Sequence, residues 1–218
     1  NGDYSTEPIK AIGDIGFGIV SYDQQDYANN KNGLNNIQAF YNGNKNFEID
    51  FKRFSFDETK HLNRYIDFEI YKEERSRVQK LFVQSGNTLS MFKEVENDGY
   101  IKVEDSTSSV YKVRLRDYKG NESWLSIPIE GKPIKEILEA PELKANTYIL
   151  ANQVNELEQE NIKVYFPKNA FYDDFYIGFG VRNDTLKLHR DIVPLTKSYT
   201  ITYNIENYAD DEKDKLFI

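Results

Sequence analysis

The chain reads Ile37-Gln38-Ala39-Phe40-Tyr41-Asn42-Gly43-Asn44-Lys45-Asn46-Phe47-Glu48-Ile49-Asp50-Phe51, two alternating runs joined at an Asn-Gly step. Apolar and polar side chains alternate there with the two-residue period of a half-buried strand. Asn42 and Gly43 both tolerate the positive φ angles that a two-residue hairpin turn requires. The stretch therefore predicts a β-hairpin and favours a β fold for the region around it.

Alternating segments and turn residues continue on both sides of this hairpin. Residues 117–121, Asp-Tyr-Lys-Gly-Asn, form a turn signal between two such segments, a pair typical of the last hairpin of an immunoglobulin-like sandwich. Residues 24–36 are polar and predict a connecting loop. The strands expected in this half of the chain are 16–23, 37–41, 45–51, 89–92, 100–103, 110–116 and 122–129.

A helical segment interrupts the strands. Ser55 and Glu58 have the spacing of a capping box, in which each side chain bonds the backbone of the other residue at a helix start. Phe56, Leu62, Tyr65 and Ile66 follow at near-helical spacing. We expect a short helix over residues 56–65. The charged residues 71–83 fit either a helix or an extended segment.

Gly131, Pro133 and Pro141 mark a change between two units. The predicted fold is mainly β, with two immunoglobulin-like β-sandwich units in tandem: residues 1–131 with the helical insertion, a linker over 132–142, and a second sandwich over 143–218 that can lack strands beyond its C-terminus. Residues 155–160 look too polar for a core. Strands of the second unit are expected at 146–151, 162–166, 175–181, 187–189 and 199–205.

Composition narrows the class of partner and the compartment. The 36 acidic and 28 basic residues give a net charge of -8, which disfavours nucleic acid and anionic membranes because both need clustered Lys and Arg. Cysteine is absent, as in cytosolic proteins and in exported bacterial proteins that fold without disulfides. The sequence has no apolar run of the roughly 20 residues that a membrane-spanning helix needs. The missing initiator Met and the apolar last residues predict that both ends lie inside a longer chain.

Residues for common enzyme chemistries are scarce. The chain has two histidines, His61 and His189, no phosphate-binding glycine loop and no Gly-x-Ser-x-Gly nucleophile motif. Both histidines are expected to have a structural role or to lie on the surface. Asp117 and Asn121 offer oxygen ligands for calcium, although a plain hairpin turn explains them equally. We therefore expect a non-catalytic region with no cofactor and no metal of its own.

One cluster has the chemistry of a sugar platform. Tyr172, Asp173, Asp174 and Tyr176 combine flat rings with hydrogen-bonding groups, and they are the candidate ligand-binding residues. The alternative is a sandwich core with a polar edge.

Several blocks together resemble a known family. They are Tyr22-Asp23, residues 41–45, the run Arg53-Phe54-Ser55-Phe56-Asp57-Glu58-Thr59-Lys60-His61-Leu62-Asn63, residues 65–67, 79–82 and 117–121. In this order they look like the region C-terminal to the catalytic domain of lysostaphin-type zinc metallopeptidases from Gram-negative bacteria. The Phe-Ser-Phe-Asp-Glu block is the most specific part. The resemblance spans residues 15–129 well and extends less firmly to 166–172 and 194–199.

The resemblance implies an accessory role. That family holds zinc with a His-x-x-x-Asp and a His-x-His motif, and neither motif surrounds His61 or His189. Zinc is thus expected only in a catalytic domain outside this chain. The resemblance implies an exported region of the periplasm or cell envelope that positions or regulates its own catalytic domain, with cell-wall glycan or peptide as a further partner. The alternatives are a glycan- or peptidoglycan-binding module and a structural or adhesive stalk segment.

Overall fold

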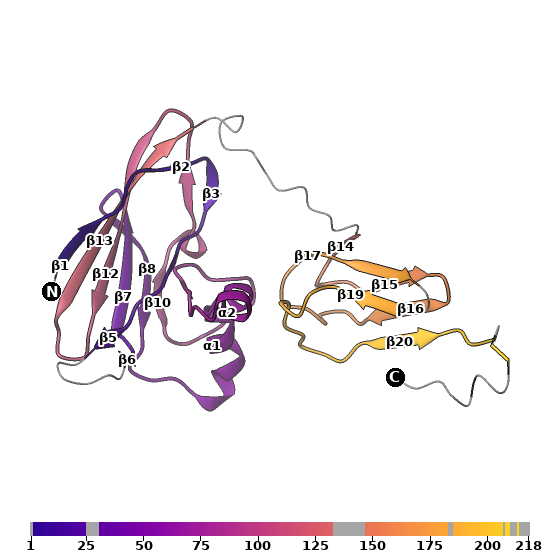
Figure 1. Ribbon diagram of the computed structural model, residues 1–218. Coiled ribbons are helices and arrows are strands. Elements are labelled where there is room, and N and C mark those ends of the chain that lie inside the picture. The colour runs from indigo at the N-terminus through magenta and orange to yellow at the C-terminus, as the bar shows by residue number, and fades with distance from the viewer. Residues whose placement is uncertain are drawn as a thin grey trace. The chain divides into compact units, whose positions relative to one another are not determined.

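The computed structural model describes residues 2–24, 31–132, 147–182, 185–206, 208–209 and 213. Over these residues the protein is mainly β, with several sheets and a helical segment (Figure 1). The chain divides into two compact units, Asn1–Pro141 and Glu142–Ile218. Apart from Lys132, the predicted linker over residues 132–142 lies outside the described residues.

The first unit is built on one seven-stranded sheet. Its strand order is β1-β13-β12-β7-β8-β10. β2 also pairs with β13, at residues 129–131, on the C-terminal side of the segment that pairs with β1. β1 and β2 both run parallel to β13, whereas the other neighbours are antiparallel. The strands are β1 (Gly2–Ser5), β2 (Ile9–Ala11), β7 (Asn36–Tyr41), β8 (Asn44–Asp50), β10 (Phe92–Val95), β12 (Ser108–Arg116) and β13 (Glu122–Gly131).

The two strongest hairpin predictions are confirmed. β7 and β8 are joined by Asn42 and Gly43, whose φ angles are +47° and +88°. These values are those of the tight turn that an Asn-Gly step favours. The side chain of Asn42 also accepts a hydrogen bond from the Val110 backbone at 3.0 Å. β12 and β13 form the second hairpin, in register from Ser108 opposite Glu130 to Arg116 opposite Glu122.

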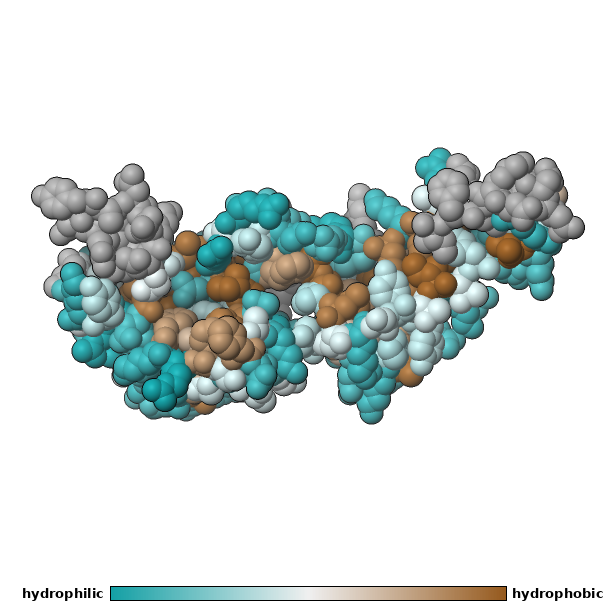
Figure 2. Space-filling model, turned by 90° about the horizontal axis from the view of Figure 1, so that it is seen from below, coloured by the Kyte–Doolittle hydropathy of each residue, from teal (hydrophilic) through white to brown (hydrophobic). Residues whose placement is uncertain are grey.

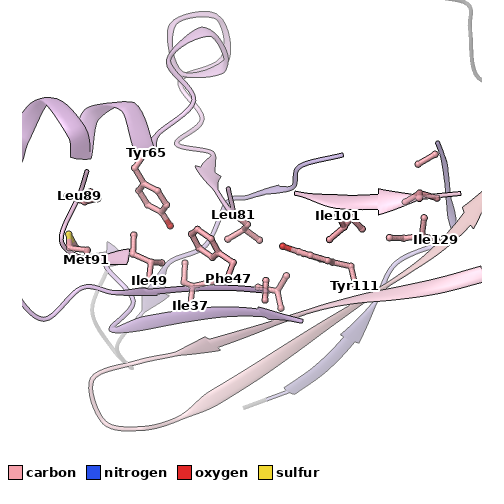
Figure 3. Packing of buried hydrophobic residues seen from close by; sticks show 14 residues of the cluster. Ile37, Phe47, Ile49, Tyr65, Leu81, Leu89, Met91, Ile101, Tyr111 and Ile129 are labelled. Carbon is pink, nitrogen blue, oxygen red and sulfur yellow. The ribbon is translucent and has the colours of Figure 1, made fainter. Parts of the chain in front are cut away.

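One face of this sheet carries the core of the first unit. Alternate residues of the central strands point to that face and are fully buried, as the two-residue period requires. Tyr65, the last residue of the helix α1 (Thr59–Tyr65), lies above the strands that carry Ile49 and Phe47 (Figure 3). The sheet's fully buried apolar residues are Ile37, Ala39, Phe47, Ile49, Tyr111, Val113 and Ile129.

Helices and short ladders form the layer over this core. The ladders are β3 (Gly13–Ile15) with β11 (Ile101–Val103) and β4 (Gly18–Ile19) with β9 (Gln79–Lys80). The helical segment comprises η1 (Phe56–Glu58), α1 (Thr59–Tyr65) and α2 (Phe68–Glu74), on the same side of the sheet as β3 (Figure 1). A short ladder, β5 (Asp23–Gln24) with β6 (Lys31–Asn32), and the turn η2 (Asn97–Gly99) complete the unit.

The opposite face of the sheet has its own aromatic contact. Phe40 and Trp124 are half-buried, with ring centroids 5.6 Å apart. The Arg114 guanidinium lies 5.9 Å from the Trp124 ring. Trp124 therefore packs outside the main core, on the face that the alternation of β13 leaves for polar and amphipathic residues.

Some element predictions for the first unit need correction. Residues 16–23 form no single strand, since Gly16 and Gly18 pack so closely on the side chains of Phe82 and Val78 that a Cβ would lie 2.6 and 2.5 Å from them. Residues 71–83, for which the sequence fits either a helix or an extended segment, contain the end of α2 and then β9.

The predicted strand 89–92 is replaced by a turn, and β10 begins only at Phe92. The backbone N–H groups of Leu89 and Ser90 bond the side chains of Asn87 and Glu58 rather than a neighbouring strand. These bonds to side chains satisfy the backbone donors that a sheet would otherwise use.

Glu48 provides a pH-dependent contribution to the first unit. Burial raises the pKa of Glu48, but hydrogen bonds from Lys45, Gln38 and Asn36 outweigh burial and lower this pKa from 4.5 to about 2. The Lys45 Nζ–Glu48 Oε2 distance is 2.7 Å and the Asn36 Nδ2–Glu48 Oε1 distance is 3.0 Å. A carboxyl whose folded pKa is lowered stabilises the fold above its unfolded pKa and loses that contribution as the pH falls toward the folded pKa.

We therefore expect Glu48→Gln to be less stable than the wild type at neutral pH, with the difference shrinking as the pH falls from 4.5 to about 2. Urea unfolding at a series of pH values measures it. A difference in unfolding free energy that stays constant over this range would contradict the assignment.

The second unit consists of three small sheets around a separate core. They are β14 (Thr147–Ile149) with β17 (Phe175–Ile177), β15 (Asn155–Gln159) with β16 (Ile162–Phe166) and β20 (Thr200–Tyr203), and β18 (Phe179–Arg182) with β19 (Thr185–Leu188). The fully buried side chains include Ile149, Ile162, Val164, Phe166 and Ile177.

This unit differs in two details from the predicted elements. Residues 155–160 contribute only Leu157 to the core, in line with their polarity, but residues 155–159 form the edge strand β15, which was not expected. The predicted strand 175–181 is divided at Gly178 into β17 and β18, because the Gly178 N–H bonds the His189 ring instead of a ladder partner.

Candidate functional site

Among the residues that the structure describes, the most exposed large apolar side chain lies at the start of the helical segment. Phe56 is 90% exposed and Phe54 is 42% exposed. Their rings pack edge to face with centroids 6.3 Å apart. We call residues 54–58 the Phe54–Phe56 knob. An aromatic pair left in water on a folded surface is a common mark of a contact site.

The backbone of the knob is held in place by a complete capping box. The Ser55 N–H donates to Glu58 Oε2 at 2.9 Å, and the Asp57 N–H donates to the Ser55 hydroxyl at 3.4 Å. The Thr59 hydroxyl donates to the Phe56 carbonyl at 2.6 Å. The capping box predicted from the sequence is confirmed.

Glu58 also ties the knob to the turn before β10. Its carboxylate accepts hydrogen bonds from the Ser90 N–H at 2.6 Å and from the Ser90 hydroxyl at 3.0 Å. The backbone N–H groups of Ser55 and Ser90 hold the pKa of Glu58 below its ordinary value. Because both ends of the knob are fixed, Phe56 is presented to solvent on an ordered support, and a partner would pay little ordering entropy to bind it.

Polar side chains surround the aromatic pair. Lys52, Arg53, Asp57 and Lys60 are exposed beside it in the sequence. Figure 2 shows apolar residues as separate patches among polar ones on the face that it displays. An apolar centre with a charged rim is the usual anatomy of a protein–protein contact.

The sequence located the capping box but misplaced Phe56. The sequence grouped Phe56 with Leu62 and Tyr65 at near-helical spacing, whereas Tyr65 is 2% exposed and Phe56 is 90% exposed. The reason is the spacing itself: nine residues are about two and a half turns at 3.6 residues per turn, so Phe56 and Tyr65 would lie on opposite faces even of one continuous helix. Phe56 lies in the 3-10 turn η1, which precedes α1.

The candidate sugar-platform residues are not equivalent in the structure. Tyr176 is 48% exposed, and Asp174 accepts a hydrogen bond from the Ala151 N–H at 2.7 Å. Tyr172 and Asp173 are half-buried. The aromatic partner of Tyr176 is Tyr148, 49% exposed and directly opposite on β14, with ring centroids 4.7 Å apart. The sequence does not point to Tyr148, because the two tyrosines meet only through the β14–β17 pairing.

Both histidines take part in local structure. The His61 ring Nε2 lies 3.3 Å from the Thr88 hydroxyl, and burial lowers the pKa of His61. His189 Nδ1 accepts a hydrogen bond from the Gly178 N–H at 3.0 Å, and its ring centroid lies 5.4 Å from that of Phe175. In the part of the chain that the structure describes, no group of three or more His, Cys, Asp or Glu side chains is arranged to hold a metal ion.

Asp117 and Asn121 form a closed hairpin turn. Asp117 Oδ1 accepts from the Asn121 N–H at 2.8 Å and Oδ2 accepts from Asn121 Nδ2 at 2.6 Å. These bonds, the one from the Asn121 side chain above all, hold the pKa of Asp117 below its ordinary value. Both carboxylate oxygens therefore already have a donor within the turn.

Comparison with known proteins yields one partial match. Residues 146–218 match the model of the Zu5-like domain family, which covers less than half of the chain. The matched stretch falls within the second unit. No curated protein and no solved structure matches the chain. The match does not concern residues 15–129, where the metallopeptidase resemblance is carried. Within the described ranges, no helix is long and apolar enough to cross a membrane.

Proposed function

We propose that this chain is a non-catalytic accessory region of an exported cell-envelope zinc metallopeptidase, and that it docks on the catalytic domain through the Phe54–Phe56 knob. Two immunoglobulin-like β-sandwich units are the architecture that this proposal assumes. Zinc belongs to the catalytic domain in this proposal, and the present chain supplies a docking surface.

One observation carries the proposal. The block by which the chain most specifically resembles that family, Phe54 to Glu58, is the block that folds into an ordered and exposed aromatic knob. Phe56 contributes nothing to the buried core of the first unit. A capping box and two hydrogen bonds from Ser90 hold this ring in an exposed position. A partner that covers the ring is the best explanation of this arrangement.

The test begins with the open reading frame upstream of Asn1. We expect it to encode a His-x-x-x-Asp motif followed by a His-x-His motif. In the intact gene product we then expect amides of residues 54–60 to exchange hydrogen about tenfold more slowly than in this chain alone, because the docked domain shields them. Phe56→Ser should abolish that protection, since removing a central aromatic anchor costs about 2 kcal/mol or more.

Tyr118→Ser is the matched control, because it removes an aromatic ring that is 63% exposed in the turn between β12 and β13. It should leave the protection of residues 54–60 intact. An upstream region without the two zinc motifs, or equal exchange in the intact product and in this chain, would refute the proposal.

A glycan-binding module is the second candidate, favoured by the exposed Tyr148–Tyr176 pair. Aromatic rings on a sheet surface stack on the apolar faces of sugars, and these two rings are each about half exposed. Retention of the chain on purified peptidoglycan, lost in Tyr148→Ala/Tyr176→Ala and kept in Tyr165→Ala, would support this function. Retention that is equal in all three would exclude the pair as its site.

A further inference from the structure

A small pocket lies in the first unit, away from the Phe54–Phe56 knob. It has a volume of about 170 Å³ and is lined by parts of β7, β8, the η2 turn and β11. Water occupies about 30 Å³ per molecule in the liquid, so the pocket has the size of a few waters or one small organic group. It opens to solvent, and none of the functions discussed above uses it.

The walls of the pocket are fixed before any ligand arrives. The Tyr41 hydroxyl donates to the Lys102 carbonyl at 3.1 Å, and the Tyr100 ring lies against Phe82 with centroids 4.8 Å apart. The buried Asn46 side chain donates to the Gly99 carbonyl at 3.2 Å. These contacts join the β7–β8 hairpin to the η2 turn and β11, so the pocket is preformed.

The η2 turn on one side of the pocket has an unusual backbone. Three consecutive residues, Asn97, Asp98 and Gly99, have φ angles of +49°, +51° and +81°. Asn97 Nδ2 donates to the Tyr100 carbonyl at 3.2 Å and helps to hold this conformation. Left-handed residues other than glycine are costly, and they persist where the surrounding structure enforces them, often at binding sites.

Two opposite charges line this pocket. Glu96 and Lys102 are both exposed. Among the residues that the structure describes, neither side chain forms an ion pair or a hydrogen bond, and the two do not pair with each other. The pocket thus presents one free carboxylate, one free ammonium group and the amide side chains of Asn44 and Asn97, in a protein whose net charge is -8.

We propose that this pocket binds a zwitterionic ligand, a free amino acid or a dipeptide, with the ligand ammonium at Glu96 and the ligand carboxylate at Lys102. Charge-assisted hydrogen bonds at both ends would orient the ligand, and the neighbouring Asn44 and Asn97 amides would bond its polar backbone. A phosphate or other anion would be repelled by Glu96, and a neutral sugar would leave both charges unused. This proposal stands independently of the accessory role proposed above.

Titration of the isotope-labelled full chain with glycylglycine, followed by NMR, tests the proposal. We expect saturable shifts of the amide signals of Asn44, Asn97 and Lys102, and none with uncharged N-acetylglycinamide. Glu96→Gln and Lys102→Met should each weaken binding about fivefold, since each removes one exposed charge contact. Raising the salt concentration should weaken it further.

The control variants Glu7→Gln and Lys112→Met remove exposed charges elsewhere on the same unit and should leave the affinity unchanged. Equal binding of N-acetylglycinamide would overturn the charge argument. Preferential binding of N-acetylglucosamine would replace the proposed ligand with a glycan, and no shift with glycylglycine at saturating concentration would overturn the site itself.

Discussion

Gly131→Ala is expected to destabilise the first unit by about 3 kcal/mol or more, a large effect for a change of one methyl group. A Cβ at this position would lie 1.9 Å from the Glu104 carbonyl oxygen and 2.9 Å from the Thr107 hydroxyl. The Gly131 N–H donates to the Thr107 carbonyl at 2.8 Å, and the Ser106 N–H donates to the Gly131 carbonyl at 3.1 Å. The end of β13 therefore cannot move to make room for the added methyl group without breaking the hydrogen bonds that join Gly131 to Ser106 and Thr107.

The single tryptophan of the chain makes this measurement specific to the first unit. Trp124 lies on β13, so its fluorescence during urea unfolding follows this unit alone. Gly33→Ala is the matched control, because no atom lies within 4 Å of its Cβ and its φ angle is not in the left-handed region. It should change the unfolding free energy by about 0.5 kcal/mol or less. A Gly131→Ala midpoint equal to that of Gly33→Ala would contradict the close approach.

The hairpins were predictable because their information is local. Asn42 and Gly43 determine the turn, and the alternation on either side determines which residues face the core. The same is true of Ser55 and Glu58, whose capping box depends on residues three apart. Where a few neighbouring residues specify both the conformation and its hydrogen bonds, sequence and structure agree.

Pairings between segments that are distant in the sequence could not be predicted from it. β1 and β2 join the sheet as parallel neighbours of β13, more than a hundred residues away, and nothing in their short stretches selects that partner. Gly16 and Gly18 looked like part of a strand, whereas they mark a close approach to Phe82 and Val78. Such contacts depend on loop closure and on the shape of the completed core.

The candidate sites show the same difference between local features, which the sequence reveals, and contacts between distant residues, which it does not. The sequence identified Tyr176 as a residue with suitable chemistry, and it singled out the Phe54–Phe56 block only through the family resemblance and the capping box. It did not reveal that Phe56 faces solvent, that Tyr148 stands beside Tyr176, or that Glu96 and Lys102 share a pocket. Exposure and cross-strand proximity are properties of the assembled fold, so residue types alone suggest a chemistry but not the place where it is used.

Gly99→Ala is expected to be the second strongly destabilising change, at about 3 kcal/mol or more. Its φ of +81° is costly for any residue with a Cβ, and that Cβ would lie 2.6 Å from the Leu81 carbonyl oxygen and 2.8 Å from the Phe82 Cα. Both contacts are to backbone, so no side-chain rotation relieves them. Because the Gly99 carbonyl holds Asn46, the change should also weaken glycylglycine binding in whatever fraction stays folded.

Gly86→Ala separates the cost of the positive φ angle from the cost of the collision with the backbone. Gly86 has a similar φ of +70°, but no atom lies within 4 Å of its Cβ, so the substitution adds backbone strain without a collision. It should cost about 1 kcal/mol by Trp124 fluorescence. If Gly99→Ala is no more costly than Gly86→Ala, the η2 turn can move away from residues 81–82. The pocket would then be an adaptable surface rather than a preformed site, which would remove the structural basis for its selectivity.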